Sequence, residues 1–184
     1  MAYSNITKKA LAAALKELMA EVPFSKISIS DICSKCSMNR KSFYYHFKDK
    51  YDLVNWIYDT EFIAIAHKKN YEASWDLTMD ILVYLYENRT FYRKALNIEG
   101  QNSFAEHFHD IIRTIISHQM QKTIPPNNSI AFQVDFFTDA FVLSIYKWIT
   151  SAEPMTPDEF IKELKLSLLY ISEIYEEIEK MPEH

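Results

Sequence analysis

The sequence predicts an all-α protein built from about nine helices. Only one glycine and six prolines occur in 184 residues, and so few helix-breaking residues favour long helices over sheets with tight turns. Along most of the chain, apolar residues recur three and four positions apart, which indicates amphipathic helices. A hydrophobic content of 48%, with 15% aromatic residues, is sufficient for a packed core.

The first helix is predicted over residues 7–21, where leucines and alanines recur at helical spacing. Pro23 ends it, because a proline disfavours helix at the residue before it. A second, shorter helix begins at Ser28, whose hydroxyl can cap the helix while Asp31, three residues later, completes a capping box. The apolar face of the first helix has to cover the helices that follow, which predicts a compact three-helix head.

The third helix of the head is predicted to begin at Asn39, a second N-cap residue. Phe43 and Phe47 lie one turn apart on it and should face the core. The turn before it contains Ser37, for which a left-handed or strained backbone is expected. Two short helices joined by a turn, the second basic and polar on its outer face, describe a helix-turn-helix for the DNA major groove.

The stretch from Arg40 to Leu53, RKSFYYHFKDKYDL, closely resembles the signature of the TetR family of transcriptional regulators. The resemblance covers residues 6–60 and implies a DNA-binding head followed by a helical body that holds an effector cavity and forms a dimer. The family often has glycine in the turn between the two motif helices, where Ser37 stands here. The chain is therefore expected to bind double-stranded operator DNA as a homodimer.

Nine residues are assigned to DNA contact. Ser28, Tyr44, His46 and Lys50 match positions of the family that usually hold phosphates. The other five lie where they can reach base edges, and Arg40 could pair with guanine; they are Asn39, Arg40, Lys41, Ser42 and Tyr45. The alternative is a helix-turn-helix kept only as a packing unit.

Charge divides the chain into a basic head and an acidic body. Residues 1–50 contain nine Lys/Arg and four Asp/Glu, a balance of +5, and residues 51–184 have a balance of −10. This asymmetry orients one end of the molecule toward phosphates. We predict a helix-turn-helix DNA-binding domain over 1–50 and a helical ligand-binding and dimerisation domain over 51–184. No apolar run has the length of a membrane span and the N-terminus lacks a signal-peptide pattern, so a cytoplasmic protein with no membrane partner is expected.

The body is predicted to contain six helices, with a break at Gly100 and a loop over 124–128. The Thr156-Pro157-Asp158-Glu159 stretch is a strong helix start, and the short connection before it predicts that the last two helices form an antiparallel pair. The expected ranges are 50–70, 74–88, 90–96, 103–122, 129–151 and 157–180.

The last two helices have more apolar surface than one core contact needs, which predicts an isologous dimer through a four-helix bundle. The residues assigned to this interface are Phe132, Phe136, Ile145, Trp148, Leu164, Leu168, Ile171 and Tyr175. Most large aromatic residues of the body should be core, and a few should line an effector pocket. The pocket candidates are Trp56, Tyr84, Phe91, Phe104, Phe108 and Phe141.

Two clusters with possible chemistry are interpreted as structural. Cys33 and Cys36 form a single C-x-x-C on the inner face of a helix, where small apolar residues belong; redox sensing is the alternative. Glu106, His107, His109, Asp110 and His118 form a patch for which a solvated face is expected and metal binding is the alternative. The sequence has no phosphate-binding glycine loop and no nucleophile motif, so an enzyme is not expected, and no cofactor or metal is assigned.

The expected function is a sequence-specific repressor that a small-molecule or protein effector releases from its operator. The stretch 82–96 is similar to a branch of Gram-positive TetR-like proteins that includes an activator of a dihydroxyacetone kinase operon. This similarity keeps open an activator controlled by a protein co-effector. A dimeric interaction protein with a non-functional head is the third possibility.

Overall fold

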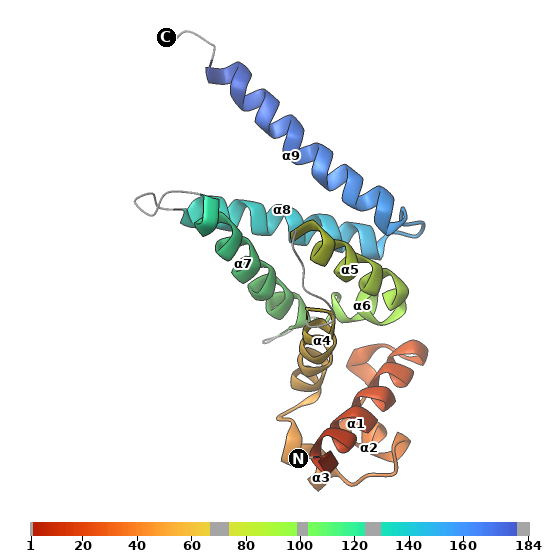
Figure 1. Cartoon of the computed structure of the whole chain (residues 1–184). Helices are drawn as coiled ribbons and strands as arrows, with labels where there is room; N and C mark the ends of the chain where they lie inside the picture. Colours follow the sequence, from red (N-terminus) through yellow and green to blue (C-terminus); the bar gives the residue numbers. More distant parts are fainter. Residues whose placement is uncertain (1, 67–73, 99–102, 124–129, 180–184) are drawn as a thin grey trace.

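The computed structural model describes residues 2–66, 74–98, 103–123 and 130–179, and its regular structure in these ranges is entirely helical. This confirms the predicted all-α fold, with a helix-turn-helix head and a helical body (Figure 1). A short 3-10 turn, η1 (Phe24–Lys26), follows the first helix. The helices are α1 (Ala2–Glu21), α2 (Ile29–Lys35), α3 (Arg40–His46), α4 (Lys50–Ala66), α5 (Ser74–Glu87), α6 (Arg89–Ala95), α7 (Phe104–Thr123), α8 (Ala131–Thr150) and α9 (Pro157–Glu179).

Each helix lies close to its predicted range, and the largest difference is at the N-terminus. α1 begins at Ala2 and not at residue 7, because residues 2–6 contain no proline or glycine to stop the helix. The predicted end of the fourth helix over 67–70, the break at Gly100 and the loop over 124–128 lie outside the described residues.

The head consists of α1, α2 and α3 packed around one apolar centre. Leu11, Leu15, Ile32 and Phe43 are fully enclosed in it, and Phe47 is also buried. Packing on the longer α1 stabilises α2 and α3, because isolated helices of seven residues are not stable in water. The prediction that Phe43 and Phe47 belong to the core is confirmed.

The helix α4 connects the head to the body (Figure 1). Leu53 near its start is buried with the head residues, and Tyr58 one and a half turns later is buried in the body. The Tyr58 ring makes edge contacts with Phe104 and Phe108, at ring-centroid distances of 5.2 and 5.7 Å. The buried side chains form one continuous apolar cluster from head to body. The domain boundary predicted at residue 50 falls at the first residue of this shared helix and stays a prediction.

The last two helices do not lie side by side as an antiparallel pair. The chain reverses after α8, but α9 diverges from α8 toward the C-terminus (Figure 1). The first turns of α9 pack on both α8 and α5: Phe160 stacks on Trp148 of α8 at a ring-centroid distance of 4.5 Å, and the Lys165 ammonium lies 5.2 Å from the centre of the Trp75 ring in α5. The second half of α9 is exposed in the single chain, with Leu169 and Ile174 more than half accessible to solvent.

Candidate nucleic-acid interface

The turn between α2 and α3 has the backbone that the sequence suggests. Ser37 has a φ of 55°, the left-handed conformation that costs a side-chain-bearing residue free energy. The amide of Met38 donates to the carbonyl of Cys33 at 2.8 Å, and the amide of Ser37 donates to that of Ser34 at 3.2 Å. These bonds satisfy the last carbonyls of α2 and fix the direction in which α3 leaves.

The two motif helices begin with the predicted side-chain caps. The Ser28 hydroxyl accepts a hydrogen bond from the amide of Asp31 at 3.1 Å, and the Asp31 carboxylate accepts one from the Ser28 amide at 2.8 Å. The Ser28 hydroxyl also donates to the Asp31 carboxylate at 2.6 Å, and this bond, together with the one from the Ser28 amide, lowers the pKa of the Asp31 carboxyl group. The Asn39 side-chain carbonyl accepts hydrogen bonds from the amide and the hydroxyl of Ser42, at 2.8 and 3.2 Å. A base contact by Asn39 would therefore have to use its amide N–H₂ group.

Arg40 and Tyr44 form a pair on the outer face of α3. The Arg40 guanidinium donates to the Tyr44 hydroxyl at 3.3 Å and lies 5.8 Å from the centre of its ring. Both side chains are exposed, and the neighbouring Tyr45 is more exposed still, with 82% of its surface accessible. The contact with Tyr44 uses one N–H donor of Arg40, so the exposed guanidinium keeps other donors for bidentate contact with a guanine edge.

A shallow hollow of about 290 Å³ lies on the same surface. Residues of α3 and its cap line most of it, and Thr7 of α1 completes it; the members from α3 and its cap are Asn39, Lys41, Ser42, Tyr45 and His46. Thr7 is not among the residues predicted to contact DNA. Its position 32 residues before Asn39 gives no local signal, and only the crossing of α1 over α3 brings the two together.

Lys50 is the assigned DNA residue with the most internal contacts. Its ammonium donates to the carbonyls of Phe24 and Ile27, at 2.8 and 2.7 Å, and lies 4.4 Å from the centre of the Phe24 ring. Partial burial lowers the pKa of Lys50. Two of its three N–H donors therefore tie α4 to the segment before α2. The phosphate contact assigned to Lys50 stays a prediction that depends on the third donor.

Comparison with known proteins identifies the class of regulator. Residues 10–57 match the family model described as bacterial regulatory proteins, tetR family, and residues 73–169 match one described as transcriptional regulator C-terminal region. The chain belongs to the TetR family of transcriptional regulators. This family membership places it among DNA-binding regulators and not among enzymes, as the sequence analysis predicted.

The TetR relatives include activators and repressors. The chain is 29% identical over 126 residues to the HTH-type dhaKLM operon transcriptional activator DhaS of Lactococcus lactis, which covers 67% of each protein. The structure named dihydroxyacetone kinase operon activator DhaS superposes with a TM-score of 0.68 at 23% identity, covering 92% of this chain and 97% of the other. The structure of a TetR transcriptional regulator from Streptococcus agalactiae superposes with a TM-score of 0.67 at 18% identity, covering 88% of this chain and 92% of the other. The structure of NalD, the secondary repressor of the MexAB-OprM multidrug efflux pump in Pseudomonas aeruginosa, has a TM-score of 0.61 at 16% identity, covering 91% of this chain and 96% of the other.

The two cysteines lie in the core of the TetR head. Cys33 is buried and Cys36 is half-buried, and neither is in a disulfide. Burial raises the pKa of both thiols, so the thiolate needed for redox chemistry is disfavoured. The Cys36 thiol donates to the carbonyl of Ile32 at 3.2 Å. These contacts support the structural interpretation.

The histidine patch on α7 contacts neighbouring helices through carboxylates. His107 Nε2 lies 2.7 Å from Asp59 of α4, and His109 Nε2 lies 3.0 Å from Asp139 of α8. The two histidines thus contact two different helices, and their rings do not point to a common site. Among the described residues, no three metal-ligating side chains come together, and none of the helices in those ranges is both long and apolar enough to cross a membrane.

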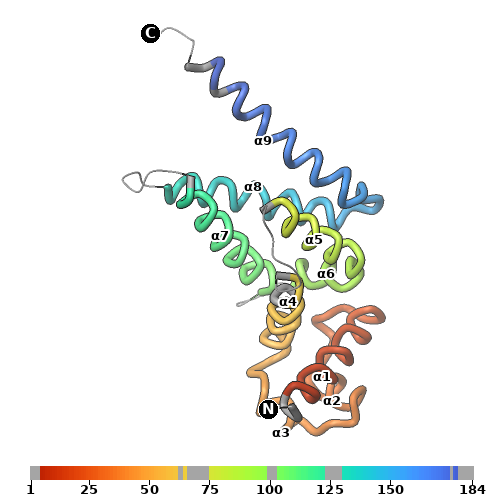
Figure 2. Tube along the Cα trace, viewed as in Figure 1, coloured from red at the N-terminus to blue at the C-terminus, as the bar shows by residue number. Residues whose placement is uncertain are grey.

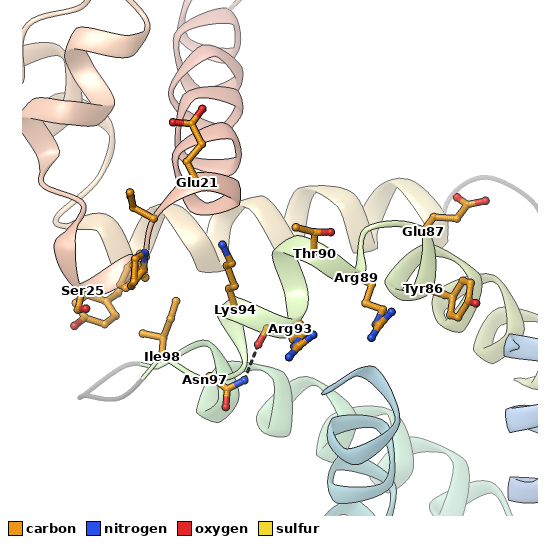
Figure 3. Close-up of a pocket in the computed structure, with 14 residues that line it drawn as sticks. Glu21, Ser25, Tyr86, Glu87, Arg89, Thr90, Arg93, Lys94, Asn97 and Ile98 are labelled. Carbon is orange, nitrogen blue, oxygen red and sulfur yellow. Dashed lines mark hydrogen bonds between the residues drawn. The ribbon is translucent and has the colours of Figure 1, made fainter. Parts of the chain in front are cut away.

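An open groove of about 1250 Å³ lies between the head and the body (Figure 3). The end of α1 and η1 form one side of it, and α5 and α6 form the other, with Tyr86, Arg89 and Lys94 among its lining. The six aromatic residues assigned to an effector pocket do not line this groove: Trp56, Tyr84, Phe91, Phe104, Phe108 and Phe141. Phe91, Phe104 and Phe108 are buried in the packed core, and the pocket assignment stays a prediction.

The residues assigned to the dimer interface divide into two groups. Ile145 and Trp148 are buried inside the chain, with 5% of each exposed, because they lie on the face of α8 that packs on the body. Their assignment to the interface is corrected here. Phe132, Phe136 and Ile171 are exposed, Leu164 and Leu168 are half-buried, and the side chain of Tyr175 lies outside the described part of the chain.

Proposed function

We propose that the protein binds an operator sequence as a homodimer, with the outer face of α3 in the major groove of each half-site. The observation that carries this proposal is the exposed Arg40–Tyr44 pair beside Tyr45 on a helix whose inner face is locked in the core. A DNA duplex presents successive major grooves roughly 34–36 Å apart. Two heads related by a two-fold axis can meet two such grooves on one face of the duplex.

The DNA experiment is a titration of labelled duplex followed by fluorescence anisotropy, with fragments from upstream of the protein's own gene and a scrambled competitor. Arg40→Ala should lose most of the preference for the specific fragment, since each bidentate base contact contributes about 1–3 kcal/mol of discrimination. Tyr44→Phe should weaken binding to all fragments. Lys162→Ala is the control, because it removes the same charge from the exposed surface of α9.

Two outcomes separate the proposal from its rivals. Wild-type binding that resists competition and weakens steeply with salt supports the operator-binding regulator. No retention of any duplex at low salt would instead favour a dimeric interaction protein with a non-functional head. If Arg40→Ala discriminates as well as wild type does, the assignment of α3 to base reading is wrong.

The homodimer is supported by apolar side chains that a single chain leaves in water. Phe132 and Phe136 on α8 are 75% and 53% exposed, and their rings stack at a centroid distance of 6.4 Å. Ile171 and Ile174 on α9 are 48% and 56% exposed. Apolar surface of this extent on the two C-terminal helices is typical of a subunit interface. A second copy that contributes the same helices would cover it symmetrically.

Sedimentation velocity tests the dimer. Phe136→Glu should shift the protein to monomer and abolish operator binding, because it places a charge in the centre of the apolar surface. Thr114→Glu, exposed on α7 and outside the assigned interface, is the control that adds the same charge to a different helix. A Phe136→Glu protein that remains dimeric at low micromolar concentration would contradict the assigned interface.

The sign of regulation has two candidates. The first is repression, relieved when an effector stabilises a different separation of the two heads. The second is activation under control of a protein co-effector, and the relative named as an activator of the dhaKLM operon supports activation. Transcription in vitro from the bound promoter distinguishes them, since added protein lowers transcript yield in the first case and raises it in the second.

A further inference from the structure

The seven-residue helix α6 lies between the head and α8, and it contacts both (Figure 2). Its first residue, Arg89, and its penultimate residue, Lys94, are five positions apart. At about 100° per residue they project from the helix roughly 140° apart, so they can bind elements on different sides. Both side chains are half-buried.

Lys94 caps the C-terminus of α1. Its ammonium donates to the carbonyl of Ala20 at 2.9 Å and also to that of Met19. Figure 3 shows the side chain extending from α6 toward the end of α1, near Glu21. The last carbonyls of a helix have no partner within it and carry partial negative charge. The last turn of α1 has no basic residue of its own, so Lys94 supplies this charge from the body.

Arg89 makes the corresponding contact with the C-terminus of α8. Its Nε donates to the carbonyl of Ile149 at 3.2 Å, and Nη2 donates to those of Ser151 and Ala152 at 2.5 and 3.2 Å. These carbonyls belong to the final turn of α8 and the residues that follow it. A short helix thus holds the ends of two others, one in the head and one in the body.

We infer that Arg89 and Lys94 are positioning residues that set the angle of the head on the body and, in the dimer, the separation of the two recognition helices. The inference rests on the proposed operator-binding function. An apolar contact between head and body has no preferred direction, whereas a hydrogen bond depends on distance and angle. A dimer whose heads are held at one angle binds one half-site spacing with high affinity. A dimer whose heads are less restrained binds several spacings, each with lower affinity.

The test measures operator affinity as a function of half-site spacing. Duplexes with the native spacing and with spacings changed by about one or two base pairs are titrated with wild type, Lys94→Met, Lys94→Arg and Arg93→Met. Lys94→Met should bind the native spacing roughly three- to tenfold more weakly and should discriminate less between spacings. Lys94→Arg should restore both properties, because it retains the positive donor. Arg93→Met, a neighbouring exposed cation on the same helix, should behave as wild type.

A second measurement keeps the inference separate from the proposed function. Hydrogen exchange of residues 17–22 at the end of α1 should be faster in Lys94→Met than in wild type, whether or not the protein binds an operator. If wild type binds no duplex specifically, the proposed function fails. If, in addition, Lys94→Met leaves the exchange of residues 17–22 unchanged, the contact of Lys94 with the end of α1 has no restraining role and the inference fails too. If wild type does bind, a spacing profile for Lys94→Met that matches wild type overturns the inference, even where thermal stability falls.

Discussion

Removal of one hydroxyl group from Tyr92 should destabilise the fold measurably. Tyr92 is fully buried, and its hydroxyl donates to the Glu61 carboxylate of α4 at 2.6 Å. Lys16 of α1 forms an ion pair with the other oxygen of the same carboxylate. Glu61 is therefore the point where α1, α4 and α6 are joined by polar contacts. Burial and the nearby Glu61 charge raise the pKa of Tyr92, so its phenol remains a donor at any pH used.

The magnitude follows from the bond that Tyr92→Phe removes. A hydrogen bond to a charged group contributes about 1.5–3 kcal/mol. Glu61 keeps Lys16, and its side chain is 27% exposed, so water can replace part of the lost contact. We expect the lower end, about 1.5 kcal/mol, because the aromatic ring is retained and no large cavity forms. For a chain of this size, such a loss lowers Tm by about 3–6 °C.

The assay is urea unfolding and thermal melting at one fixed protomer concentration, because association makes apparent stability depend on concentration. Tyr45→Phe is the matched control: it removes the same group from a ring that is 82% exposed, and its stability should equal that of wild type. Equal stability of Tyr92→Phe and wild type would refute the argument that Glu61 is a structural junction.

Three further predictions concern the head and the start of α9. Ser37→Gly should raise the free energy of unfolding by about 0.5–1 kcal/mol in urea titrations, because glycine adopts a φ of 55° without steric cost; an unchanged or lower value would contradict this. Hydrogen bonds from Thr156 lower the pKa of Glu159, so its cap stabilises at neutral pH and is lost as pH falls through that lowered value. Glu159→Gln should therefore flatten the decline in stability between about pH 5 and pH 3, and a decline as steep as in wild type would argue against the cap. Because Cys33 and Cys36 are shielded thiols, oxidised and reduced protein should bind DNA equally in anisotropy titrations, and any sizeable difference would favour a redox switch.

Helix positions were largely predictable because their signals are local. Ser28, Asn39 and Thr156 each accept hydrogen bonds from the amide three residues later, so a cap can be identified within a window of four residues. The left-handed backbone of Ser37 was also predictable, because it is a property of a single residue in the turn. Boundaries that depend on such caps agree with their predicted positions, and the N-terminus of α1, whose capping position lies outside the described residues, differs most.

Contacts between distant residues were not predictable from the sequence. Lys94 and the α1 carbonyls it caps are 74 and 75 residues apart, and nothing near Lys94 in the chain distinguishes it from a solvated lysine. The assignment of Trp148 to the dimer interface failed for a related reason. α8 has apolar side chains on both faces, and periodicity alone cannot tell which face packs on the protomer's own body and which is left for a partner.

The contacts between head and body suggest why α4 alone does not determine the head's orientation. Leu53 and Tyr58 place α4 in the apolar cores of both parts, and these contacts favour burial without favouring one rotation of the head about the helix axis. The hydrogen bonds from Lys94 of α6 to the end of α1 lie away from that axis. Restraints at a distance from an axis resist rotation about it, so a small displacement of α6 would turn the head. In the proposed homodimer, an effector that displaced α6 would thereby change the separation of the two recognition helices.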